Sequence, residues 1–236
     1  MTNFGASLHL PQDAESHRRS CLTSGNARHT TAQSTSQNLP HDSAVGAWPF
    51  ADLTPLKYSV ILCDPPWRFT NYSAKGEAKN PNQHYACMSL ADIKALPVSQ
   101  LAAPDCALIM WCTSPLLDQQ IDVLKAWGFT YKAAGAWGKQ SKTGNALAFG
   151  GGYILRSAAE FFIVGTIGAP KRQSRSIRNL IMAPVREHSR KPDALHDMVE
   201  ALYEGPYCEL FARASRPGWD VWGNQTTKFD EEVVNA

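Results

Sequence analysis

An acidic residue, two prolines and a tryptophan follow one another at Asp64–Trp67, directly after the apolar run Tyr58–Cys63. The run is rich in residues that favour β-strands, and the prolines end it because proline cannot donate to a strand ladder. In α/β folds, ligands bind in the crevice at the carboxyl ends of the strands. The pattern therefore predicts a carboxylate, a rigid backbone carbonyl and an aromatic ring at a ligand site. The alternative is an ordinary turn, in which aspartate and proline are common.

These groups would suit methyl transfer to the exocyclic amine of adenine. The lone pair of that amine is delocalised into the ring, so the nitrogen is a weak nucleophile. The carboxylate of Asp64 can accept one N–H and the carbonyl of Pro65 the other, which favours a more tetrahedral nitrogen. Pro66 fixes the backbone, and Trp67 can stack on a base taken out of its helix or presented in a single strand. The methyl donor then needs only in-line positioning, so this chemistry requires no metal.

Two further pairs of polar residues follow expected strands near the carboxyl end of the chain. Glu209 and Arg213 lie at the end of the segment YCELFAR, and Asn224 and Gln225 follow the short run WDVW. Acidic and amide groups at strand ends often bind ribose hydroxyls, and arginine can pair with a carboxylate. A solvated edge residue or a simple turn is the alternative at each position.

Lys191 precedes Pro192 at an expected helix start, and Gly150–Gly152 precede Arg156 and Glu160. Helix N-termini and a nearby lysine both attract carboxylates, although a solvated lysine is the commoner case. Three glycines in a row predict a mobile loop or a close backbone approach. They do not form G-x-G-x-x-G, which argues against a nicotinamide-binding enzyme.

Two basic clusters are candidates for contacts with phosphate. They lie outside clear apolar periods, and phosphate contacts position a nucleic acid without selecting its sequence. The alternative is a pair of solvated loops, because the formal net charge of the chain is only +2. The first cluster is Lys171, Arg172, Arg175 and Arg178, and the second is Arg186, His188, Arg190 and Lys191.

Short apolar runs alternate with segments of helical period, which predicts an α/β fold with a mostly parallel sheet and helices on both faces. Ser89 and Asp92 have the spacing of a capping box. Ser114 and Pro115 predict a helix start, and Gly128 predicts the end of that helix. Strands are expected at 58–63, 106–112, 129–137, 160–165, 179–182, 207–212 and 219–222, and helices after residues 89, 114 and 191.

The composition sets the expected boundaries and compartment. Residues 1–45 are polar and poor in large apolar groups, which predicts disorder, followed by one domain at 46–226 and a flexible tail at 227–236. The six cysteines have no metal-ligand spacing, which argues against a zinc site and suits a reducing cytoplasm. No apolar stretch is long enough to span a membrane, so we expect neither secretion nor membrane insertion.

Taken together, the motifs resemble those of the MT-A family of adenine-N6 methyltransferases, also called METTL-type, over roughly Tyr58 to Gln225. The resemblance implies a seven-stranded, Rossmann-like methyltransferase sheet with a permuted motif order, and S-adenosylmethionine as cofactor. One motif alone would be weak, but their joint occurrence in this order is specific. The motifs are CDPPW, HYACMSLADI, ALIMWC, GAWGK, GGGYILRSAAEFFIVG, REHSRKPDALHDMVEAL, ELFAR and GWDVWGNQ.

The resemblance also implies roles for individual residues. Asp64–Trp67 would hold the target adenine and line the methyl end of the cofactor. Ala214, Ser215 and Arg216 depart from the proline and polar residues that follow ELFAR in better-known members. Tyr85 would belong to a gating loop, Glu160 would lie near the base pocket, Lys191 near the cofactor, and Asn224, Gln225 and Arg213 on its ribose side.

The expected protein is a cytoplasmic methyltransferase acting on adenine in nucleic acid, as a monomer, homodimer or heterodimer. DNA is favoured over RNA, because a compact chain with only a polar N-terminal segment is more typical of bacterial or phage enzymes. Two alternatives stay open. One is a catalytically silent subunit that binds nucleic acid, and the other is a methyltransferase for another planar amine, such as cytosine N4.

Overall fold

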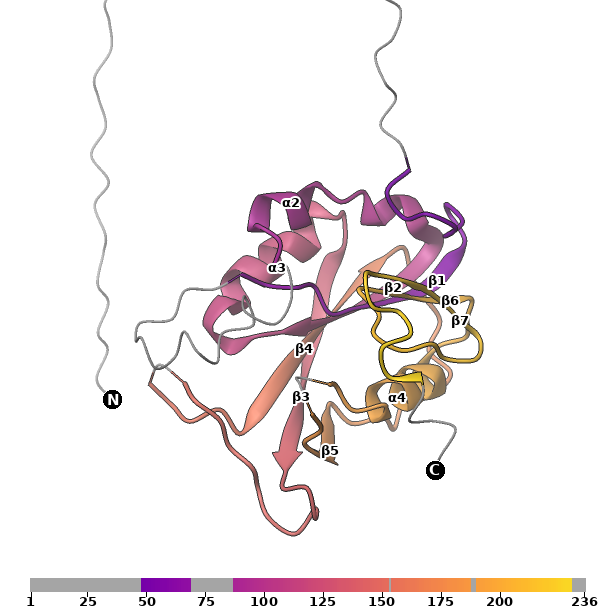
Figure 1. Cartoon of the computed structure of the whole chain (residues 1–236). Helices are drawn as coiled ribbons and strands as arrows, with labels where there is room; N and C mark the ends of the chain where they lie inside the picture. Colours follow the sequence, from indigo (N-terminus) through magenta and orange to yellow (C-terminus); the bar gives the residue numbers. More distant parts are fainter. Residues whose placement is uncertain (1–47, 69–86, 153, 188–189, 231–236) are drawn as a thin grey trace, which may run out of the picture. The chain divides into compact units, whose positions relative to one another are not determined.

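A computed structural model of the protein describes residues 48–68, 87–152, 154–187 and 190–230. These residues form a seven-stranded sheet in the order β5-β3-β4-β2-β1-β6-β7 (Figure 1). The predicted α/β fold with a Rossmann-like sheet is confirmed. The strands are β1 (Tyr58–Cys63), β2 (Ala102–Cys112), β3 (Thr130–Gln140), β4 (Ala159–Ile167), β5 (Leu180–Pro184), β6 (Tyr207–Leu210) and β7 (Trp219–Trp222).

One strand of the sheet runs against the others. β4 pairs antiparallel with both β2 and β3, whereas the remaining pairs are parallel. β3 and β4 are consecutive in sequence and adjacent in the sheet, and residues 141–158 connect them. The amino end of β4 therefore lies at the same sheet edge as the carboxyl ends of β1, β6 and β7, so β4 can supply a side chain there.

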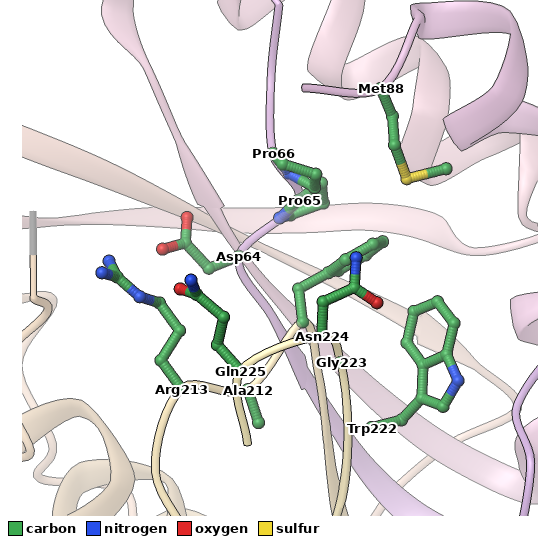
Figure 2. A pocket seen from close by; sticks show the side chains of 11 residues that line it. Asp64, Pro65, Pro66, Met88, Ala212, Arg213, Trp222, Gly223, Asn224 and Gln225 are labelled. Atoms are coloured by element: carbon green, nitrogen blue, oxygen red, sulfur yellow. The ribbon is translucent and has the colours of Figure 1, made fainter. Parts of the chain in front are cut away.

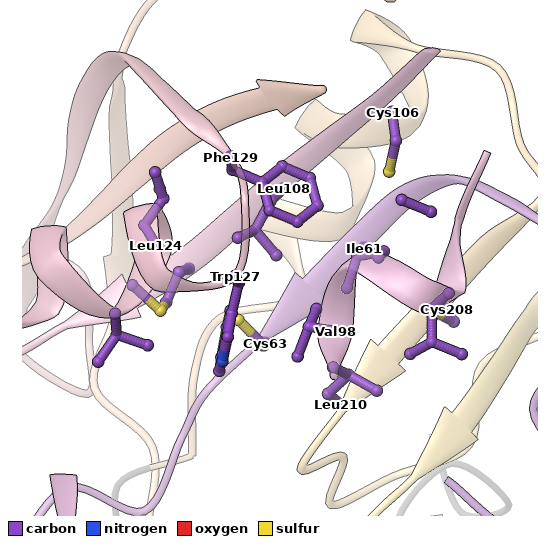
Figure 3. Packing of buried hydrophobic residues seen from close by; sticks show 14 of the residues in the cluster. Ile61, Cys63, Val98, Cys106, Leu108, Leu124, Trp127, Phe129, Cys208 and Leu210 are labelled. Atoms are coloured by element: carbon purple, nitrogen blue, oxygen red, sulfur yellow. The ribbon is translucent and has the colours of Figure 1, made fainter. Parts of the chain in front are cut away.

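Both faces of the sheet are buried at its central strands β1 and β2, as their unbroken apolar runs predict. Along β1, Ile61 and Cys63 face one hydrophobic cluster, and Val60 and Leu62 face the other. Figure 3 shows the first cluster, in which Trp127 and Leu124 lie near strand residues such as Ile61 and Leu108. This alternation places helices on both sides and leaves the strand ends as the accessible part of the sheet.

Helices α2 (Leu90–Ala95) and α3 (Leu117–Ala126) cover the first cluster. The predicted cap of α2 is confirmed, because the Ser89 hydroxyl accepts a hydrogen bond from the backbone N–H of Asp92 at 3.1 Å. At α3 the cap prediction is wrong. Ser114 and Pro115 form a short 3₁₀ turn with Leu116, and the side chain of Gln120 bonds Thr113 instead.

Helix α4 (Ala194–Leu202) covers the opposite cluster through Leu195 and Val199. Its Glu200 accepts hydrogen bonds from Trp219 at 2.7 Å and from Arg216 at 2.8 Å. These bonds fasten the helix to β7. None of the helices among the described residues is long and apolar enough to cross a membrane.

The two chain ends compare differently with the sequence predictions. Residues 1–45, for which we expect disorder, lie outside the described residues. Of the expected tail, residues 227–230 are described, and Phe229 is buried there. The guanidinium carbons of Arg190 and Arg213 lie 4.6 and 4.8 Å from the centre of its ring. This part of the tail therefore packs on the domain.

Candidate active site

A cavity of about 370 Å³ opens at the carboxyl ends of β1, β6 and β7. In Figure 2 the polar ends of Asp64, Arg213 and Gln225 lie on one side of it, and Met88 and Trp222 on the other. The wall thus combines charged and amide groups with apolar surface, as is usual for small-molecule sites. Its lining residues are Asp64, Pro65, Pro66, Met88, Phe211, Ala212, Arg213, Trp222, Gly223, Asn224 and Gln225.

The register of three parallel strands brings the lining segments together. Cys63 pairs with Leu210, and Leu210 pairs with Trp222, so the residues after them emerge side by side. The backbone N–H of Ala212 donates to the carbonyl of Trp222 at 3.0 Å, which closes the floor of the cavity. A Cβ atom on Gly223 would lie 2.9 Å from the Ala212 carbonyl oxygen, so only glycine allows this close approach.

Asp64 belongs to a chain of alternating charges. The Lys191 ammonium lies 2.8 Å from a carboxylate oxygen of Asp64 and 3.8 Å from one of Glu160. The other oxygen of Glu160 lies 3.2 Å from the ammonium of Lys139. Glu160 reaches this edge because β4 runs antiparallel, and Lys139 because β3 runs parallel to β1. The structure therefore brings together Asp64, Glu160 and Lys191, which the sequence analysis had selected in separate motifs.

Burial and charge act in opposite directions on these two carboxylates. Burial raises the pKa of Asp64, and Lys191 opposes this without cancelling it. Burial also acts to raise the pKa of Glu160, but Lys191 and Lys139 outweigh it and hold that pKa below its usual range. Asp64 thus combines the acceptor capacity of a carboxylate with a higher proton affinity than an exposed aspartate.

A smaller cavity of about 60 Å³ adjoins the first and shares Asp64 and Arg213 with it. In its wall a ring nitrogen of His196 (Nε2) lies 2.8 Å from Glu209 Oε2. The His196 ring also stands edge-on to Trp219, with 5.0 Å between centroids. These contacts hold the Glu209 carboxylate at the end of β6, beside the cavity.

Trp67 does not occupy the position expected of a base-stacking ring. Its side chain is only 5 % exposed and belongs to the first hydrophobic cluster. The indole N–H donates to the backbone carbonyl of Trp111 at 3.3 Å, and the Trp67 backbone N–H donates to Pro65 at 2.8 Å. The ring therefore anchors the turn of the Asp64–Trp67 motif to the core and does not line the cavity, and its stacking on a base stays a prediction.

Replacing Trp67 by alanine should accordingly lower the free energy of unfolding by about 3 to 5 kcal/mol, because a large buried ring is removed. Trp67→Phe, which retains most of the buried surface, should lose clearly less. Urea unfolding followed by circular dichroism measures both. Unchanged stability of Trp67→Ala together with a raised KM for nucleic acid would instead restore the stacking role.

The first basic cluster is not brought to this edge. The backbone N–H of Gln173 donates to the carbonyl of Leu202 at the far end of α4, and the charge of Arg172 acts on Tyr203. Lys171, Arg172 and Arg175 are exposed there, on the segment before β5 and outside the two cavity walls. Their predicted contact with the substrate at the site is therefore not supported by this placement.

The remaining predicted substrate residues have different positions. Arg186 pairs with Asp193 at the start of α4, and its side chain is partly buried. Arg156 lies on the exposed loop between β3 and β4. Tyr85 and His188 lie outside the described residues.

Several residues of the site are absent from the sequence predictions. Met88, Phe211 and Trp222 carry no reactive group, and only their strand-end positions mark them. Lys139 could have been found, because it stands in the motif GAWGK two residues after the strand expected at 129–137. His196 could not, because its helix position on α4 shows no link to Glu209 in sequence.

The sequence of this chain is similar to those of known methyltransferases. The MT-A70 family matches residues 58–225. A type II methyltransferase of a Mycoplasma species, M.MunI, is 32 % identical over 194 residues, which cover 74 % of this chain and 80 % of the relative. The human N(6)-adenine-specific methyltransferase METTL4 is 28 % identical over 191 residues, covering 73 % and 38 %. A Drosophila melanogaster N(6)-adenosine-methyltransferase MT-A70-like protein is 31 % identical over 182 residues, covering 75 % and 28 %.

Proposed function

This chain belongs to the MT-A70 family, and on that basis we propose that it is an S-adenosylmethionine-dependent methyltransferase acting on the N6 amine of adenine in DNA. The observation that carries the proposal is the Asp64 carboxylate at the cavity wall, 2.8 Å from the Lys191 ammonium and followed by two prolines. The match to the Mycoplasma relative covers 80 % of that protein. The other two relatives are much longer than the matched region.

The cavity residues fit an adenosyl cofactor. Met88, Phe211 and Trp222 offer apolar surface for a flat purine, and Asn224 and Gln225 offer amide groups beside it. Glu209, held by His196, and Arg213 would face the ribose and the amino-acid end, together with Lys191. The bound cofactor supplies an electrophilic methyl group, which in-line positioning brings to the amine.

The residues of the chain then act on the amine itself. Asp64 accepts one N–H of the amine, and the Pro65 carbonyl accepts the other with its second lone pair, since the first already receives the Trp67 N–H. Both hydrogen bonds draw the nitrogen lone pair out of the ring. When the nitrogen becomes methylated, its surplus proton passes toward a carboxylate oxygen of Asp64, whose raised pKa suits this acceptance.

DNA is favoured over RNA in this proposal because of the extent of the matches. The chain covers 80 % of the type II methyltransferase, but only 28 % of the relative named as an adenosine methyltransferase. We also place the enzyme in the cytoplasm, in keeping with the free thiols of Cys63, Cys87, Cys106, Cys112 and Cys208.

The direct test is to incubate the protein with methyl-labelled cofactor and with matched DNA and RNA oligonucleotides, followed by mass spectrometry of the nucleosides. The expected product is N6-methyladenine in DNA. Label in RNA alone would mean that RNA, and not DNA, is the substrate. Label on cytosine N4 would mean that the enzyme methylates that amine instead of adenine N6. If neither polymer is labelled, and S-adenosylhomocysteine leaves the melting temperature unchanged, the chain is instead a silent binding subunit.

A further inference from the structure

Residues 141–158 connect β3 to β4 at the sheet edge that carries Asp64. We call this connection the β3–β4 loop. Its two stems are joined by the Lys139–Glu160 ion pair, and Glu160 shares Lys191 with Asp64. Because the ends of both strands lie at this sheet edge, the loop borders the place where a target base must arrive.

Large apolar side chains of the loop project into solvent. Ile154 is 95 % exposed and Leu155 is 81 % exposed, and Leu147 and Phe149 are also mostly exposed. Apolar side chains this exposed and this close in sequence mark interaction sites more often than bare surface. Ile154 and Leu155, the most exposed of the four, thus form an apolar tip among the described residues of the loop.

The base of this tip is held in place. Arg156 donates from Nε to the carbonyl of Gly150 at 3.0 Å, and its guanidinium lies 4.8 Å from the centre of the Phe149 ring. The backbone N–H of Gly150 donates to Ser157, and that of Ser157 donates to Gly151. These hydrogen bonds hold Gly150 and Gly151 beside Ser157, so Ile154 and Leu155 extend from a fixed base.

The charge of the loop identifies the kind of partner. Residues 141–158 include Lys142 and Arg156 and no aspartate or glutamate. A loop with an apolar tip, whose own charged residues are all positive, suits a polyanion with a stacked interior, since phosphates attract the cations and base steps accept the apolar groups. A protein partner would need no such absence of acidic residues.

We propose that the β3–β4 loop is a wedge that enters double-stranded DNA at the step from which the target adenine is extruded. This rests on the proposed function, and it specifies duplex DNA as the substrate form. An enzyme that modifies adenine N6 in a duplex must unpair and unstack the base, which costs a few kcal/mol. Ile154 and Leu155 fill the vacated step, while Arg156 contacts the adjoining phosphates.

The test compares duplex and single-stranded forms of one random-sequence DNA pool. In the variant Ile154→Ser/Leu155→Ser, initial methylation rates on the duplex should fall at least about tenfold, because the extruded state loses its support. Rates on the single strands, which need no extrusion, should stay within about twofold of wild type. Leu56→Ser is the matched control, since Leu56 is 68 % exposed elsewhere and should leave both rates unchanged.

Two outcomes would overturn the wedge. Equal losses on both DNA forms would assign the loop a general structural role. If the wild type sediments as a dimer and the variant as a monomer, while the duplex rate per active site is unchanged, the tip is a contact between two copies of this chain. A wild-type protein inactive on both DNA forms would refute the proposed function itself, which keeps the two failures distinct.

Discussion

Asp64→Asn should lower kcat/KM for adenine methylation by about a hundredfold to ten-thousandfold, the range typical of a lost proton acceptor. Asparagine keeps the size of the side chain but replaces one acceptor oxygen with a donating NH2 group. It therefore cannot hold the amine N–H and accept the surplus proton in the same way. The fold should tolerate the change, because burial already disfavours the charged form of Asp64. Lys191 also keeps an ion-pair partner, the carboxylate of Glu160.

Kinetics and binding must be measured on the same preparation. Calorimetric titration with S-adenosylhomocysteine and the melting temperature should both remain close to wild type. Asp122→Asn is the matched control, because Asp122 is an exposed carboxylate on α3 away from the cavity, and its kcat/KM should be unchanged. An Asp64→Asn protein that retains most of its activity would remove Asp64 from the chemistry and leave it a structural partner of Lys191.

Lys191→Met should produce the second large effect, and one that depends on pH. Only ionised Asp64 can take up the surplus proton of the methylated amine, so activity falls as the pH drops through its pKa. Burial sets that pKa above the usual aspartate range, and Lys191 lowers it. Without the ammonium the pKa rises further, so the acid limb of the pH–rate profile should move to higher pH.

The loss should therefore be tenfold or more near neutral pH and should diminish toward alkaline pH, as expected when a charge partner of a buried carboxylate is removed. Lys191→Arg, which retains the positive charge, should keep the acid limb close to its original position. The measurement is kcat/KM between pH 5 and 9 for the three proteins. A loss that is the same at every pH would mean that Lys191 acts on binding alone.

Local sequence pattern was sufficient to predict most of the sheet. Most of β1 and residues Cys106–Cys112 of β2 are buried on both faces, so the composition of these apolar runs is distinctive. Strand direction was harder, because a period of two residues is the same in either direction. The reversal of β4 follows from its antiparallel pairing with the preceding strand β3, which the run AEFFIVG does not encode.

The role of a residue could be predicted only where the end of one strand fixes its position. Asp64 ends β1, and its position follows from the strand and the prolines. The direction of the Trp67 side chain could not be predicted, because an aromatic residue three positions after Asp64 can turn either to the cavity or to the core, and the contact with Trp111 decides it. Arg172 was misplaced because the path of a loop around the sheet depends on tertiary contacts, such as that with Tyr203.

The strand order has a consequence for how the cavity opens and closes. β1 lies between β2 and β6 with both faces covered, whereas β7 is a four-residue strand that, among the described residues, pairs with β6 alone. Local unfolding should therefore release β7 at a lower free energy than β1, so Asn224 and Gln225 can detach while Asp64 stays in place. A ligand that contacts both walls ties an edge strand to a central one, so the amide hydrogens of β7 should exchange more slowly when the site is filled.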